Sequence, residues 1–167
     1  MSTPTPGGES QSTTADIGEA KKQALHYLKF RARSSTEMRQ YLSRKGYQPP
    51  IQEKVVGWLQ ELGYIDDLQF SLQWIENRCR TNPRGERRLV LELRQKGIRQ
   101  PIIDEAMIRF RETVNETELA YELAANRVKA YHRDDQNTKR RKLISYLERR
   151  GFRMNDIRQV IDQVLEE

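Results

Sequence analysis

The chain has 167 residues, of which 36% are hydrophobic and 32% are charged. So small a share of core-forming side chains argues against one thick sandwich or barrel and favours small helical units that each bury one stripe. Lys and Arg number 30 against 24 Asp and Glu, a net charge of +6, so we expect an anionic partner: a nucleic acid, a nucleoprotein or an acidic protein face. Arg outnumbers Lys, as in surfaces that hold phosphate or carboxylate, although genome composition explains such a bias equally well.

Several classes of protein are excluded by what the sequence lacks. Cys79 is the single cysteine, which excludes an intrachain disulfide framework and a Cys-based zinc site. No apolar run approaches the roughly 20 residues that cross a bilayer. The first 20 residues carry no Lys or Arg and no apolar block, unlike a signal peptide. We therefore expect a cytoplasmic protein in reducing surroundings, without a metal or a cofactor.

The first segment, residues 1–19, is rich in Ser, Thr, Pro and Gly, with Ile17 as its bulky apolar residue. Such a composition buries too little surface to offset the entropy of ordering, so we expect a disordered tail. The segment holds Glu9, Asp16 and Glu19 and no basic residue. The rest of the chain therefore carries 30 basic and 21 acidic side chains, a net charge of +9.

From Ala20 onward apolar residues recur three and four positions apart, as on one face of an α-helix. No stretch alternates with period two for long enough to predict a strand. Three capping residues stand three positions before Glu or Gln, which marks helix starts. These pairs are Ser34 with Glu37, Asp66 with Gln69, and Asn115 with Glu118.

Three glycines reveal an internal repeat. Gly46, Gly97 and Gly151 each follow Leu-x-x-(Lys/Arg) and precede an aromatic residue or Ile, at spacings of 51 and 54 residues. Each is expected to end a helix with positive φ. The alignment divides the chain into three-helix units over 20–64, 65–113 and 114–167. One unit of about 50 residues is marginal alone, so we expect an all-α tandem array of three three-helix repeats, elongated and curved.

The same pattern predicts the extent of each helix. First helices are expected over 21–31, 66–79 and 116–131, second helices over 35–45, 84–96 and 138–150, and third helices over 50–62, 101–111 and 155–166. The polar stretch 131–137 is expected to let the third unit swing relative to the others.

The second helix of each unit is its most basic element. In the second unit Arg84, Arg87, Arg88 and Arg94 are expected to share one helix face, interrupted by Leu91. A solvated helix surface explains any single residue equally well, but recurrence in all three units favours a binding surface. The predicted partner-binding or phosphate-binding residues are Arg31, Arg33, Arg39, Arg44, Lys45, Arg84, Arg87, Arg88, Arg94, Lys96, Lys139, Arg140, Lys142, Arg149 and Arg150.

Other interpretations of the sequence carry less weight. A three-helix unit with a sharp turn also fits a helix-turn-helix module, but Asn and Gln are sparse on the second helices, which favours phosphate or acidic-protein contact over base reading. Asp66 and Asp67 fit helix capping better than a metal pair. Trp58 and Trp74 fit core packing better than base stacking. There is no Gly-rich phosphate loop, nucleophile motif or set of carboxylates spaced with a His, so we do not expect an enzyme.

Motifs in all three units resemble the RecX family of regulatory proteins, over residues 21–165. The similar stretches are Ala24-Leu25-x-Tyr27-Leu28 and Tyr41-Leu42-x-x-Lys45-Gly46-Tyr47 in the first unit, Leu62-Gly63-Tyr64-Ile65-Asp66-Asp67 and Glu92-Leu93-x-x-Lys96-Gly97-Ile98 in the second, and Leu147-x-x-Arg150-Gly151-Phe152 in the third.

The resemblance implies an array of three-helix repeats that binds the RecA recombinase filament and contacts RecA and its single-stranded or duplex DNA. It also implies that the protein limits filament growth, ATP hydrolysis, strand exchange and coprotease activity, and so modulates DNA repair, recombination and the SOS response. We expect a monomer, away from membranes, that binds DNA more weakly on its own. A stand-alone helical DNA-binding module is the alternative. The signature residues Gly46 and Asp66 are expected to be structural.

Overall fold

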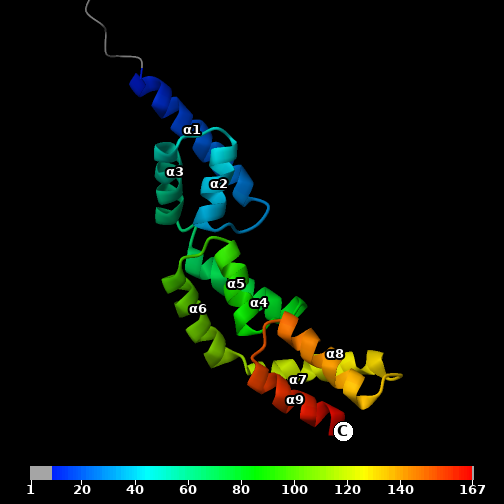
Figure 1. The fold of residues 1–167 in the computed structure, drawn as a ribbon. Coiled ribbons are helices and arrows are strands. Elements are labelled where there is room, and N and C mark those ends of the chain that lie inside the picture. Colours follow the sequence, from blue (N-terminus) through cyan, green and yellow to red (C-terminus); the bar gives the residue numbers. More distant parts are fainter. Residues whose placement is uncertain (1–8, 167) are drawn as a thin grey trace, which may run out of the picture. The chain divides into compact units, whose positions relative to one another are not determined.

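The computed structural model describes the backbone of residues 9–166 and the side chains from Asp16 onward. This part of the chain is all α-helical, as the sequence predicts, and contains no strand (Figure 1). Its elements are α1 (Glu9–Leu28), α2 (Ser35–Arg44), α3 (Pro49–Glu61), α4 (Asp67–Thr81), α5 (Glu86–Gln95), α6 (Gln100–Thr113), α7 (Glu116–Val128), the 3-10 helix η1 (Lys129–Tyr131), α8 (Gln136–Arg149) and α9 (Met154–Glu166).

The first helix corrects the expected disordered tail. α1 begins at Glu9, so residues 9–19 are helical, and residues 1–8 lie outside the described part of the chain. Once the docked part of the helix has formed, each further residue adds one backbone hydrogen bond. No proline interrupts residues 9–28, so the helix extends through a segment whose composition alone disfavours order.

The structure divides into two compact units, which differ from the three predicted repeats and are called the first unit and the second unit below. The first contains the residues up to Phe70 together with Lys96–Ile98, and the second contains Ser71–Gln95 and Arg99–Glu167. In the first unit α1, α2 and α3 pack their apolar faces together (Figure 1). The buried side chains of this core are Ala20, Ala24, Met38, Leu42, Val55, Val56, Leu59 and Ile65.

The second unit has two sets of buried apolar residues. α5 and α6 contribute Leu89, Leu93, Ile103, Ala106, Met107 and Phe110. α7, α8 and α9 enclose a core of Ala120, Ala124, Leu143, Leu147, Phe152, Ile157, Val160, Ile161 and Val164. No helix in the described part of the chain combines the length and apolar character needed to span a membrane.

The predicted caps start their helices. The Ser34 hydroxyl accepts from the Glu37 amide at 3.1 Å, and the Glu37 carboxylate accepts from the Ser34 amide at 3.3 Å, which completes a capping box. Asp66 Oδ1 accepts from the backbone amide of Gln69 at 3.0 Å. Asn115 Oδ1 accepts from the Glu118 amide at 3.2 Å. Asp66 is therefore a helix cap, as predicted.

The predicted glycine turns end the second helices. Gly46, Gly97 and Gly151 follow α2, α5 and α8 with φ of 91°, 74° and 88°. In this left-handed region a side chain is disfavoured because its β-carbon crowds the backbone. The glycine at each turn therefore fixes where the helix ends and where the next one begins.

The second helix of one repeat begins against the glycine turn of the following repeat. We call this contact the repeat joint. In the first unit Ser34 Oγ donates to the Lys96 carbonyl at 2.7 Å and Thr36 Oγ1 donates to the Gly97 carbonyl at 2.9 Å. In the second unit the Gly85 amide donates to the Arg150 carbonyl at 2.8 Å. Gly85 stands 51 residues after Ser34, the spacing of the repeat.

A carboxylate completes each repeat joint. The Ser35 amide donates to Asp67 Oδ1 at 2.7 Å, and the Ser35 hydroxyl donates to Asp67 Oδ2 at 2.6 Å. At the second joint the Glu86 amide donates to Glu116 Oε1 at 3.1 Å. Asp67 and Glu116 are the first residues of α4 and α7. Each places a negative charge at the positive end of the preceding second helix, which is favourable.

Candidate functional site

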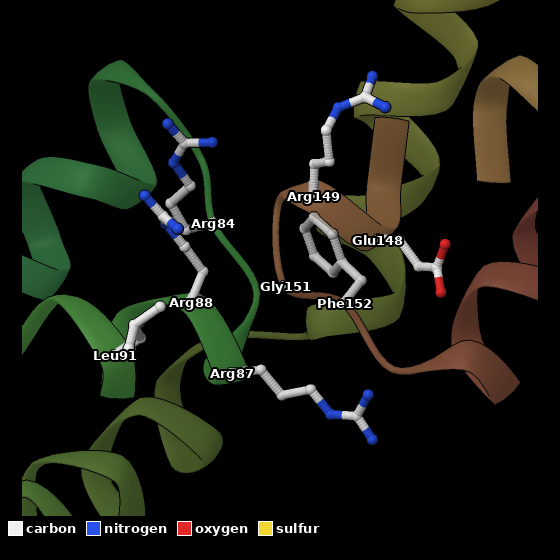
Figure 2. Close-up of a pocket in the computed structure, with 8 residues that line it drawn as sticks. All are labelled: Arg84, Arg87, Arg88, Leu91, Glu148, Arg149, Gly151 and Phe152. Atoms are coloured by element: carbon white, nitrogen blue, oxygen red, sulfur yellow. The ribbon is translucent and has the colours of Figure 1, made fainter. Parts of the chain in front are cut away.

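A groove of about 720 Å³ lies in the second unit, beside the repeat joint. Arg84 and Arg88 form one wall, and Arg149 lies on the opposite wall above the ring of Phe152 (Figure 2). The side chains of Arg87 and Glu148 point away from the space between these walls. The full lining is Arg84, Arg87, Arg88, Leu91, Glu148, Arg149, Gly151 and Phe152.

Two glycines allow the walls of the groove to approach each other. A β-carbon on Gly85 would lie 2.5 Å from the carbonyl oxygen of Gly151, and a β-carbon on Gly151 would collide with the backbone of Arg88. The absence of both side chains lets the loop before α5 touch the turn after α8. This contact brings Arg84 and Arg88 together with Arg149 and Arg150, which lie some sixty residues further along the chain.

Glu92 holds together arginines that line or adjoin the groove. Its side chain is 6% exposed, and its Oε2 accepts hydrogen bonds from Trp74 Nε1 at 2.9 Å and from Arg78 Nε at 2.8 Å. Its Oε1 lies 3.4 Å from Arg88 Nε and 3.9 Å from Arg84 Nε. Because both Nε atoms face Glu92, the outer nitrogens of these two guanidinium groups remain available to the groove.

Guanidinium groups outnumber carboxylates at the second repeat joint. Arg78, Arg84 and Arg88 share the single carboxylate of Glu92. Arg150 donates at 2.9 Å to Asn82 Oδ1 and at 2.9 Å to the carbonyl of Pro83, both uncharged. Burial, followed by repulsion from Arg150, lowers the pKa of Arg84 although Glu92 opposes the change. The arrangement therefore favours an anion.

The geometry also suits the shape of an oxyanion. The Nε atoms of Arg84 and Arg88 are buried near Glu92, so the donors left for a ligand in the groove are the outer nitrogens of the two groups. A guanidinium group offers paired N–H donors in a plane, which match the oxygens of phosphate and carboxylate. Leu91, 42% exposed, adds an apolar surface to the same wall. The groove can thus hold a charged group and an adjoining apolar one.

The structure alters the predicted arginine stripe of the second repeat. α5 begins at Glu86, so Arg84 lies in the preceding loop and reaches the groove through the repeat joint. Arg94 points to a different neighbour, donating to Gln100 Oε1 at 3.0 and 2.8 Å. Arg84, Arg87, Arg88 and Arg94 therefore do not form one helix face.

Most of the other predicted basic residues have partners of their own. Arg33 stacks 3.7 Å from the ring centre of Tyr27. Arg44 and Lys45 are exposed and Lys139 is half-buried. The remaining pairs, with their N–O distances, are Arg31–Glu37 at 2.9 Å, Lys96–Glu37 at 3.1 Å, Arg39–Glu53 at 2.7 Å, Arg140–Asp162 at 2.6 Å and Lys142–Asp134 at 2.6 Å.

The sequence does not predict that Trp74, Arg78 and Glu92 contact one another and position the arginines of the groove. The repeat alignment does contain a signal for the excess of positive charge at the second joint. At the first joint Glu37 pairs with Lys96, and the residue 51 positions later is Arg88, whose backbone lies against Gly151, the residue after the cation Arg150. This exchange of a carboxylate for a guanidinium explains why positive charge accumulates at the second joint.

Comparisons with known proteins agree with the repeat. The models of the first, second and third three-helix domains of RecX match residues 20–59, 66–107 and 115–161. The crystal structure of RecX from Lactobacillus salivarius superposes with a TM-score of 0.81 at 23% identity, covering 90% of this chain and 97% of that one. This structural likeness supports the fold.

Similar sequences occur over nearly the whole chain. A Regulatory protein RecX of Prosthecochloris aestuarii is 34% identical over 151 residues, covering 90% of this chain and 97% of that protein. A Regulatory protein RecX of Amycolatopsis mediterranei is 30% identical over 149 residues, covering 89% of this chain and 85% of that protein. With three domain models matched in order, the chain belongs to the RecX family of regulatory proteins.

Proposed function

We propose that this chain regulates the RecA recombinase by binding to the RecA filament on DNA. One contact is the groove lined by Arg84, Arg88 and Arg149, which we call the arginine groove. Occupancy of the filament inhibits its growth, its ATPase and its strand-exchange and coprotease activities, and so modulates DNA repair and recombination. Membership of the RecX family supports the choice of partner. The observation that carries the role of the groove is the excess of guanidinium groups over carboxylates around Glu92.

The proposed mechanism requires binding and no chemical step. Arg84 and Arg88 present their outer N–H groups on one wall, and Arg149 presents its own on the other. A phosphate group of the DNA or a carboxylate of RecA satisfies such donors equally well. The protein acts as a monomer in the cytoplasm, where the filament forms.

Arg149 offers the sharpest test because it is exposed and the described residues give it no ion-pair partner. Arg149→Gln should weaken inhibition of the RecA ATPase on single-stranded DNA by roughly tenfold or more, since a hydrogen bond to a charged group contributes about 1.5–3 kcal/mol. Arg158→Gln is the matched control: Arg158 is exposed on α9, outside the groove lining. If both variants lose inhibition equally, or if neither variant loses it, the groove is not a contact with the filament.

A stand-alone DNA-binding module is the second candidate, because the groove also fits phosphate. It requires tight binding to naked duplex DNA, with log affinity falling against log salt by about 0.9 per phosphate contacted. Fluorescence anisotropy with naked duplex and with a preformed RecA filament separates the two functions. Weak binding to duplex beside strong binding to the filament excludes the module.

A further inference from the structure

The glycine turn that ends α2 is exposed, whereas its two counterparts are covered. A β-carbon on Gly97 would collide with the side chain of Thr36, and one on Gly151 would collide with Arg88. A β-carbon on Gly46 would meet no described atom within 4 Å, and Gly46 is exposed. The start of a second helix thus lies against two of the three equivalent turns, and the third turn is open.

The open turn has the same construction as the covered ones. Gly46 has φ of 91°, beside 74° and 88° at Gly97 and Gly151. Lys45 precedes it, as Lys96 and Arg150 precede the other two. The residue after the glycine is buried at the covered turns, where Ile98 is 5% and Phe152 1% exposed. Its counterpart Tyr47 is half-buried.

The joint within the first unit shows what such a turn accepts. Hydroxyl groups at the start of α2, from Ser34 and Thr36, donate to the carbonyls of Lys96 and Gly97. The third residue of that helix, Glu37, pairs with Lys96 Nζ at 3.1 Å. The matching chemistry for the Gly46 turn is therefore a helix start with Ser or Thr at its cap and Glu three residues later, because Lys45 supplies the cation.

We infer that the Gly46 turn is an open repeat joint that receives the start of a helix from a protein partner, of the form Ser/Thr-x-x-Glu. The identity of the partner, a recombinase subunit of the filament, rests on the proposed function. The turn contacts protein, whereas the arginine groove faces an oxyanion. Gly46 then has two roles, ending α2 and leaving room for the docked helix.

A second copy of this chain fits the turn poorly. The starts of α2 and α5 already lie against the turns of the next repeats. In α8 the positions that match Ser34 and Ser35 are Lys139 and Arg140, which lie inside the helix. Their positive charges would face Arg44 and Lys45, so like charges oppose self-association through this turn.

The test is Gly46→Asn, with Gly63→Asn as its matched control. Asn tolerates the left-handed region better than other residues. Gly63, after α3, has φ of 74° and no described atom within 4 Å of an added β-carbon. Both variants should fold. Gly46→Asn should weaken binding to a preformed filament at least about fivefold, as overpacking a fitted contact does, and Gly63→Asn should leave it unchanged.

A charge variant provides a second measurement. Lys45→Glu places a negative charge against the expected Glu of the docked helix and should weaken filament binding. Lys54→Glu, at an exposed position of α3, makes the same change in net charge and should not. Equal binding of all four variants and wild type overturns the open joint while leaving the proposed function intact.

Two further outcomes separate the alternatives. A wild-type chain that does not bind the filament refutes the proposed function, and the inference with it. Sedimentation velocity that shows wild-type self-association, lost only in Gly46→Asn, assigns the turn to a second copy and overturns the inference. A monomeric wild type, with filament binding weakened in Gly46→Asn alone, supports it.

Discussion

Gly46 and Gly151 share one backbone conformation in different surroundings, which allows the cost of conformation to be separated from the cost of space. Gly46→Ala should destabilise the protein by roughly 1–2 kcal/mol, the cost of a left-handed residue with a side chain. Gly151→Ala should cost about 1–3 kcal/mol more, because its β-carbon meets Arg88. Urea denaturation followed by helical circular dichroism measures the difference. Equal losses would contradict the close approach at the second joint.

Glu92 is the residue on which the arginine cluster depends. Glu92→Ala removes the carboxylate shared by Arg78, Arg84 and Arg88 and should lower the free energy of unfolding by about 3–5 kcal/mol, as when one partner of a buried pair is removed. Glu92→Gln should cost less, since its amide oxygen still accepts from Trp74. A Glu92→Ala variant as stable as wild type would show that the cluster holds together without it.

At the scale of elements, Glu86 ties α5 to α6 and to Arg153, the residue before α9. Its carboxylate accepts from Arg111 at 2.5 and 3.0 Å and from Arg153 at 3.0 Å. The hydrogen bond from Arg111 lowers the pKa of Glu86 below its ordinary value of 4.5, although burial opposes the change. A lowered pKa means that the native state favours the ionised carboxylate.

The stability that Glu86 contributes is therefore fully present above pH 4.5 and is lost as the pH falls through its lowered pKa. Glu86→Gln should be less stable than wild type at pH 7, by up to about 1 kcal/mol per ion pair because both arginines are half exposed. The difference should vanish in acid. Urea midpoints between pH 2 and 7 check this, and a constant difference would contradict it.

How far the sequence predicts each element depends on the range of the interaction. The cap at Ser34 and the turn at Gly97 involve residues within one helical turn, so the local pattern predicts both. The start of α5 depends on the repeat joint, where Gly85 donates to the carbonyl of the distant Arg150, so the local pattern predicts a start at residue 84, before the observed start at Glu86. The extension of α1 to Glu9 depends on propagation from a docked core, which composition does not encode.

At the scale of the whole molecule, a net charge of +6 predicts an anionic partner but not its contact surface. The residues of the groove, such as Arg84 and Arg149, stand far apart in the sequence and meet only because Gly85 packs on the turn at Gly151. The basic residues could therefore be predicted as candidates, while the subset that meets could not. Their partners, such as Glu53 for Arg39, also depend on tertiary contacts.

Salt dependence reports whether the groove meets DNA or protein. If Arg149 holds a phosphate, the slope of log affinity for single-stranded DNA against log salt should become shallower by roughly 0.7 in Arg149→Gln, the value for one phosphate contact on a single strand. Arg158→Gln should keep the wild-type slope. An unchanged DNA slope together with weaker filament inhibition would assign the groove to carboxylates of the recombinase.

The length of α8 has a consequence for protein engineering. α8 spans 14 residues, whereas α2 and α5 span 10 each, and Lys139 occupies the position that Ser34 and Gly85 hold. A designed repeat fused after the third could not use the natural joint unless α8 were shortened by a turn and residue 139 replaced by Ser or Gly. A designed repeat fused ahead of the first would find the Gly46 turn ready. Modules can thus be added in one direction without changing the existing helices.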